Sequence, residues 1–172
     1  MSGEQPNVLY REVQRPRHMW LIGLVVIVIA AVFWWGLIQQ IILGTQFGDK
    51  PAPDWILIIF WILFGIVFPL GTFKVKQITE VREDGIYIRF IPFHFQYRIF
   101  PIQDVRHFRS ITYSSIGRFG GWGIRINLQG ERAYNMGGKH GIELKLSSGT
   151  IIVIGTQKPD ELEKVLYSIN QY

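Results

Sequence analysis

Two long apolar stretches without a charged residue dominate the first half of the chain. No Asp, Glu, Lys or Arg occurs between His18 and Asp49, and none occurs between Asp54 and Lys74. As a helix rising about 1.5 Å per residue, 19–43 reaches roughly 37 Å, which exceeds a bilayer core of about 30 Å. The second window, 55–73, is close to the minimum length for a span. The pattern therefore predicts two transmembrane helices.

The segment between the two windows indicates how they are arranged. Residues 44–54 are too few for anything but a short connection, and Pro51 and Pro53 disfavour helix there. We therefore expect an antiparallel helical hairpin with 44–54 as an external loop. A cleaved signal peptide is disfavoured, because the first apolar stretch is much longer than the 7–15 residues of such a signal.

Basic residues flank the hairpin on both sides and predict its orientation. Arg11, Arg15 and Arg17 precede it, and Lys74 and Lys76 follow it. By the positive-inside rule, both termini are expected in the cytoplasm. The chain then divides into a cytoplasmic tail (1–18), two spans of the inner membrane with the loop that joins them, and a cytoplasmic domain (74–172).

After residue 74 the pattern changes to short alternating runs, which are typical of strands. Asp84-Gly85 is a strong hairpin signal between two of these runs. From Pro159 the period changes to that of a helix, with Leu162, Val165, Leu166 and Ile169 on one face. The expected strands are 77–82, 85–91, 95–99, 105–113, 124–128, 133–136 as a short edge strand, 141–146 and 150–154.

Three local sequences carry a family resemblance. They are Glu-Asp-Gly-Ile-Tyr-Ile-Arg-Phe-Ile-Pro-Phe at 83–93, Gly-Gly-Trp-Gly-Ile-Arg at 120–125 and Ile-Gly-Thr-Gln-Lys-Pro-Asp-Glu-Leu at 154–162. With the opening at 5–12, they resemble small prokaryotic membrane proteins of unknown function that place a bacterial pleckstrin-homology-like (PH-like) domain after two transmembrane helices. The resemblance implies a membrane-anchored α+β protein, in which the hairpin precedes a small antiparallel β-barrel capped by a C-terminal helix. It supplies no catalytic or binding residues.

Composition excludes several kinds of chemistry. The chain has no Cys, which rules out disulfides, thiolate metal sites and cysteine nucleophiles. Its four histidines lack metal-binding spacing, and Gly137-Gly138-Lys139-His140-Gly141 lacks the spacing of a phosphate-binding loop. We therefore expect no enzyme, no cofactor, no metal and no catalytic residue.

Net charge points to a lipid surface as a neighbour. Residues 74–172 contain fourteen Lys and Arg against nine Asp and Glu, a net charge of +5. Basic residues near an anionic leaflet are attracted to it by about 1 kcal/mol each. Because these residues are scattered singly rather than clustered with aromatic residues, nucleic acid is not an expected partner.

Two groups of residues are candidates for contacts with partners. Arg118, Phe119 and Trp122 lie in the glycine-rich segment 113–123, where they could meet lipid or a peptide; the alternative is that Phe119 and Trp122 fill the end of the barrel. On neighbouring expected strands, a cationic face could be formed by Arg89, Arg98, Arg106 and Arg109; the alternative is a solvated basic face under a membrane.

The sequence thus predicts an integral membrane protein that presents an interaction or oligomerisation domain, bound to the bilayer and to protein partners or other copies of itself. Two alternatives remain: a receptor for an anionic lipid or another small anionic ligand, and an accessory subunit of a transporter or membrane enzyme.

Overall fold

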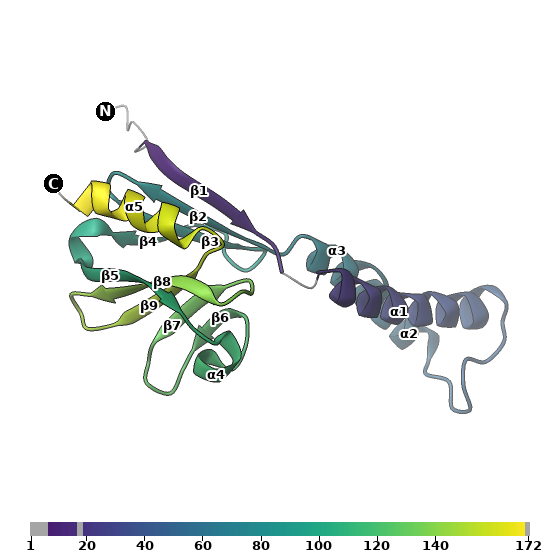
Figure 1. Cartoon of the computed structure of the whole chain (residues 1–172). Coiled ribbons are helices and arrows are strands. Elements are labelled where there is room, and N and C mark those ends of the chain that lie inside the picture. The colour runs from purple at the N-terminus through teal and green to yellow at the C-terminus, as the bar shows by residue number, and fades with distance from the viewer. Residues whose placement is uncertain (1–6, 17–18, 171–172) are drawn as a thin grey trace. The chain divides into compact units, whose positions relative to one another are not determined.

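The computed structural model describes residues 7–16 and 19–170 and divides the chain into two compact units (Figure 1). One unit is His18–Val75. The other combines Met1–Arg17 with Lys76–Tyr172, so it is built from both sides of the apolar segment.

The first unit is a pair of apolar helices. The first begins as α1 (Met19–Leu37) and ends in a wider π-helical turn, Ile38–Ile42. The second consists of α2 (Asp54–Phe60), a π-helical segment Trp61–Val67, and α3 (Phe68–Phe73). Both are long and apolar enough to cross a membrane: an 18-residue window within Met19–Ile42 has a mean hydropathy of 2.8, and one within Asp54–Phe73 has a mean hydropathy of 2.5.

Aromatic and polar contacts join the two helices as a hairpin. The ring of Phe33 stacks on that of Phe64 at 5.1 Å, and Trp34 meets Trp61 edge-on at 5.0 Å. At the loop end, Gln40 Nε2 donates to Asp54 Oδ1 (2.7 Å), which fixes the start of the second helix. Gln40 therefore bonds across the hairpin.

The second unit contains a four-stranded antiparallel sheet whose strands are adjacent in the order β1-β2-β3-β4. The strands are β1 (Val8–Gln14), β2 (Lys76–Arg82), β3 (Gly85–Ile91) and β4 (Arg98–Pro101). Strand β4 begins later than the expected strand 95–99, because Phe95 and Gln96 form a bend and Tyr97 precedes the strand.

Strand β1 corrects the expectation that 1–18 is a tail outside the folded domain. Val8–Gln14 pairs along β2, with Gln14 opposite Gln77. Alternate residues of β1 face the interior, and two of them, Glu12 and Gln14, are polar. Of the expected tail, residues 1–6, 17 and 18 lie outside the described residues.

The second sheet is five-stranded and mixed, in the order β5-β8-β9-β7-β6. Strand β7 runs parallel to β9, whereas the other neighbouring pairs of this sheet are antiparallel. The expected edge position of 133–136 is therefore wrong, since β6 forms that edge. The strands are β5 (Val105–Thr112), β6 (Gly123–Ile126), β7 (Arg132–Asn135), β8 (His140–Leu146) and β9 (Ile151–Gly155).

The two sheets do not close into the antiparallel barrel that the sequence predicted, because each keeps its own edge strands and one strand pair is parallel. A short helix, α4 (Ser115–Phe119), was also not expected; Ser114 Oγ caps it by accepting from Gly117 N at 3.1 Å.

The predicted C-terminal helix is confirmed as α5 (Pro159–Asn170). Leu162 and Leu166 are fully buried, and Ile169 is also buried, in a core that residues of both sheets share. The helix therefore covers the interior that the open sheets leave, as its apolar stripe requires.

Candidate functional site

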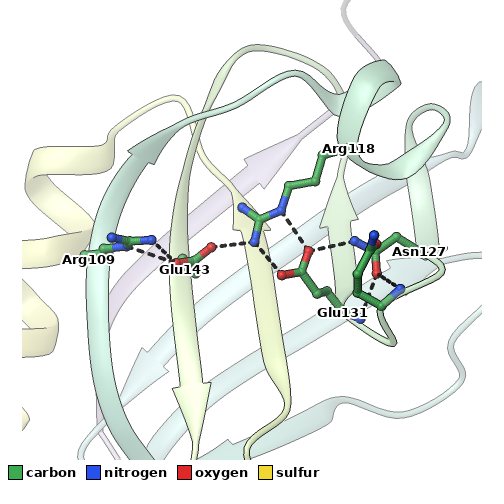
Figure 2. A network of polar contacts seen from close by, with 6 residues as sticks. Arg109, Arg118, Asn127, Glu131 and Glu143 are labelled. Atoms are coloured by element: carbon green, nitrogen blue, oxygen red, sulfur yellow. Dashed lines mark hydrogen bonds and ion pairs between the residues drawn. The ribbon is translucent and has the colours of Figure 1, made fainter.

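The guanidinium of Arg118 on α4 is held between two carboxylates (Figure 2). Arg118 Nε donates to Glu131 Oε2 and Nη2 donates to Glu131 Oε1, both at 2.9 Å. The same Nη2 donates to Glu143 Oε2 on β8 at 2.6 Å. Glu143 also accepts from Arg109 on β5, at 2.6 Å. The cluster thus joins α4 to the face of the second sheet.

Asn127 extends this cluster into the β6–β7 turn. Its Nδ2 donates to Glu131 Oε2 at 2.6 Å, and its Oδ1 accepts from the backbone N–H groups of Gln129 and Glu131. The amide therefore fixes both the turn and the carboxylate that binds Arg118.

Electrostatics favours the ionised form of both carboxylates. Burial acts to raise the pKa of Glu143, but hydrogen bonds from Arg118 and Arg109 lower it by more, so the pKa lies below the ordinary value. The hydrogen bond from Arg118 likewise lowers the pKa of Glu131. Because these carboxylates already satisfy Arg118, the cluster serves to hold the domain together.

The other two residues of the predicted contact segment lie in different environments. Phe119 is 5% exposed and packs against Tyr113, Ala133 and Val153. Trp122 is exposed, and its carbonyl oxygen accepts from Arg125 Nε at 2.9 Å.

Arg89 and Arg98 lie on either side of the loop that joins β3 to β4. Arg98 pairs with Ile88 across the two strands and is exposed. Arg89 Nε donates to the carbonyl oxygen of His94 (3.3 Å), and its guanidinium lies 5.8 Å from the centre of the Tyr97 ring. Because Arg98 lies opposite Ile88, the strand neighbour of Arg89, the register places the two arginines on opposite faces of the sheet rather than on one cationic face.

That loop presents two phenylalanines which the sequence analysis did not single out. Phe93 is 66% exposed and Phe95 is 90% exposed. No distinct sequence signal marked them, because the alternating pattern that predicted the strand 95–99 includes Phe95 and extends back to Phe93.

His94 itself points inward. Its ring meets those of Phe90 (6.5 Å) and Tyr134 (6.2 Å). Burial, and then the charge of Arg98, lower its pKa below the ordinary value. The neutral ring anchors the middle of the loop.

A buried carboxylate ties β1 to the segment that follows β9. Glu12 is 8% exposed, and its Oε2 accepts from Thr156 Oγ1 (2.7 Å) and from the hydroxyl of Tyr10 (2.8 Å). Its Oε1 accepts from Gln157 N at 2.8 Å. Thr156 and Gln157 are each more than 140 residues from Glu12 in sequence, so local patterns did not reveal their contacts with it.

Beside this carboxylate lies an open pocket of about 470 Å³. Three of its lining side chains, Arg15, Lys139 and His140, are basic, and Gly137 and Gly138 contribute backbone. The arrangement suits a small anion. Among the described residues, no group of three or more His, Asp or Glu side chains could hold a metal ion.

No curated protein and no solved structure shows significant similarity to this chain. A family of unknown function, DUF6141, matches residues 1–171. This match includes the apolar hairpin and the two paired strands on either side of it. The chain therefore belongs to the DUF6141 family of unknown function.

Proposed function

We propose that this protein crosses the cytoplasmic membrane twice and holds its folded domain, with both termini, on the cytoplasmic face. The pairing of Gln14 with Gln77 carries the proposal. These residues flank the apolar helices and are neighbours in one sheet, so a chain that leaves the sheet at β1 must return to the same side at β2. Two helices of spanning length satisfy that requirement with two crossings.

Burial and long-range contacts support a permanent anchor. Only 17% of the first apolar window and 6% of the second are buried within the chain, whereas a core helix of a soluble protein is mostly buried. Cleavage of the first helix as a signal sequence would also remove β1, which Glu12 bonds to Thr156 and Gln157.

The domain then acts as a non-catalytic interaction module of PH-like type. Its prominent charged groups form internal clusters, around Glu143 and around Glu12, rather than an open catalytic set. Two sheets covered by a C-terminal helix are compatible with PH-like architecture, and the parallel β7–β9 pair is a departure from it.

The edge strand β6 supports binding to another polypeptide. Ile124 and Ile126 are exposed on β6, on either side of the single exposed cation Arg125, and Leu128 follows in the turn. Strand β5, at the opposite edge, instead carries the exposed polar residues Arg106, His107 and Arg109. Charged edges discourage strand addition, while an apolar edge invites it. The partner is a strand of a membrane protein or of a second copy.

A second candidate function is binding of a small anionic ligand or lipid headgroup. The pocket lined by Arg15, Lys139 and His140 favours it. Binding of the full chain to vesicles that follows bulk charge alone, unchanged by Lys139→Ala, would reject it.

The topology is tested with single cysteines, since the natural chain contains none. We expect Asp49→Cys to react with a membrane-impermeant maleimide on intact cells. Asn7→Cys and Ser147→Cys should react only after lysis. Labelling of Asn7→Cys and Ser147→Cys on opposite sides of the membrane would overturn the proposal.

A further inference from the structure

One end of the domain is defined by the strands from which the apolar hairpin departs. Gln14 ends β1, and its Nε2 donates to the carbonyl oxygen of Gly155 at the end of β9 (2.7 Å). Gly155 pairs with Gly141, next to His140. The two sheets therefore meet at this point, which we call the hairpin end of the domain.

The loop 92–97 lies at this same end. Ile91, the last residue of β3, pairs with Lys76, the first residue of β2. The second apolar helix ends at Phe73, so three residue steps of at most about 10 Å in total separate it from Lys76. The short link from Phe73 to Lys76 and the pairing of Lys76 with Ile91 therefore limit how far the start of the loop 92–97 can lie from the end of this helix.

Local contacts hold the loop in a shape that projects its phenylalanines. His94 N donates to the carbonyl oxygen of Phe90 at 2.6 Å. The hydroxyl of Tyr97 donates to Glu80 Oε1 at 2.9 Å. With the loop fixed at both positions, Phe93 and Phe95 remain 66% and 90% exposed. Such exposure of two large apolar rings is typical of a surface that meets an apolar partner.

The charges around the loop match an anionic surface. The segment 92–98 contains no Asp or Glu, and it ends at the exposed cation Arg98. Arg89 lies against the loop through His94. On the other side of the hairpin end are Arg15 and Lys139. Apolar rings framed by cations are the pattern of groups that enter the headgroup region of anionic membranes.

We infer that the loop 92–97 inserts Phe93 and Phe95 into the interface of the bilayer that the hairpin crosses, with Arg98 against lipid phosphate. This inference rests on the proposed membrane anchor. It adds that the domain is docked on the bilayer in one orientation, with the hairpin end facing lipid. The edge of β6 is therefore held at a fixed distance from the bilayer surface, where it is presented to partners.

The test uses the full chain in vesicles of phosphatidylcholine and phosphatidylglycerol. Single cysteines at Phe95→Cys and Leu128→Cys are labelled with an environment-sensitive fluorophore. Leu128 is the matched control, because it is a fully exposed apolar residue in the β6–β7 turn, at the opposite end of β7 from Asn135 and the hairpin end. Ile27→Cys, in the first apolar helix, reports on the anchor.

We expect the label at Phe95→Cys to emit at shorter wavelength and to be quenched severalfold more by spin-labelled lipid than the label at Leu128→Cys. Equal, solvent-like behaviour of these two labels, with strong lipid quenching at Ile27→Cys, would overturn the docking but leave the anchor. Absence of lipid quenching at Ile27→Cys would overturn the anchor and the docking together. Equal lipid quenching at Phe95→Cys and Leu128→Cys would refute the assignment to this loop.

Discussion

Gln14 and Gln77 lie opposite each other in adjacent antiparallel strands, although the whole apolar hairpin separates them in the chain. Both side chains are buried, and Gln14 also bonds to the carbonyl oxygen of Gly155 in the second sheet. The hairpin is thus an insertion into the connection between β1 and β2, and the folded domain is completed only when the chain has returned from it.

The first prediction follows from this insertion. Replacing residues 15–76 by Asn-Gly should give a soluble, folded domain, because Asn-Gly favours the two-residue turn that joins adjacent antiparallel strands. We expect cooperative thermal unfolding and a dispersed amide spectrum.

The matched control is a fragment of residues 76–172, which lacks β1. It exposes the edge of β2 and removes the acceptor for Thr156 and Gln157, so we expect it to aggregate or unfold. Equal stability of the two proteins would mean that β1 is dispensable and would contradict the insertion.

The second prediction concerns the buried carboxylate of Glu12. Glu12→Ala leaves the hydroxyl of Thr156 and the N–H of Gln157 without their acceptor, which should lower the free energy of unfolding by about 1–3 kcal/mol. Val13→Ala is the control, since Val13 is exposed on the same strand. Chemical denaturation of the detergent-solubilised chain measures both, and similar small losses would refute the role given to Glu12.

Local patterns predicted the elements whose stability is local or whose faces are uniformly apolar. Strand β3 (Gly85–Ile91) has the predicted bounds, since Asp84-Gly85 sets the turn before it. The stripe of α5, with Leu162 and Leu166, is buried as its spacing requires. The two apolar helices follow from their composition alone.

Elements that depend on distant partners could not be predicted in this way. The inward face of β1 includes Glu12 and Gln14, which are buried because Thr156 and Gly155 meet them from the other end of the chain. The parallel pairing of β7 with β9 likewise joins two strands that are not consecutive in the chain, since β8 lies between them in sequence. The sequence suggested that Arg118 could contact a partner, because the two carboxylates that bind it lie on other elements.

The third prediction separates the two arginines of the charged cluster. Arg118→Met leaves both Glu131 and Glu143 without their shared cation, which should cost about 1–3 kcal/mol, since its side chain is only 28% exposed. Arg109→Met should cost less than about 1 kcal/mol, because that side chain is 62% exposed. Thermal unfolding at neutral pH gives the comparison, and the reverse order would be inconsistent with the geometry.

Acid should also distinguish these variants. The pKa values of Glu131 and Glu143 lie below the ordinary 4.5, so their stabilisation is complete above pH 4.5 and is lost as pH falls through the lowered values. In Arg118→Met this loss should shrink. An unchanged acid transition would show that other carboxylates control it.

The fourth prediction concerns His94 and a higher range of pH. Its pKa is lowered by burial and by Arg98, so the unfolded chain binds a proton more readily than the folded one. Stability is therefore full above about pH 6.5 and declines as pH falls through the lowered pKa of the folded state. We expect the melting temperature to fall from pH 7.5 to 5.5, and His94→Phe to reduce that fall. His107→Gln, at an exposed position on β5, should leave it unchanged, and a reduction in that variant instead would refute the assignment.

The fifth prediction concerns the exposed edge of β6. If a second copy adds its own β6 there, the full chain in detergent should be a concentration-dependent dimer, because an apolar edge strand pairs readily with another strand. Ile126→Lys places a charge on that edge and should shift the protein toward the monomer, as measured by light scattering after gel filtration. Val13→Lys, on the edge strand of the other sheet, is the matched control and should leave the dimer intact. A monomer at every concentration would exclude self-association in detergent and leave a different membrane protein as the partner of β6, whereas a dimer that only Val13→Lys dissociates would place the contact on β1.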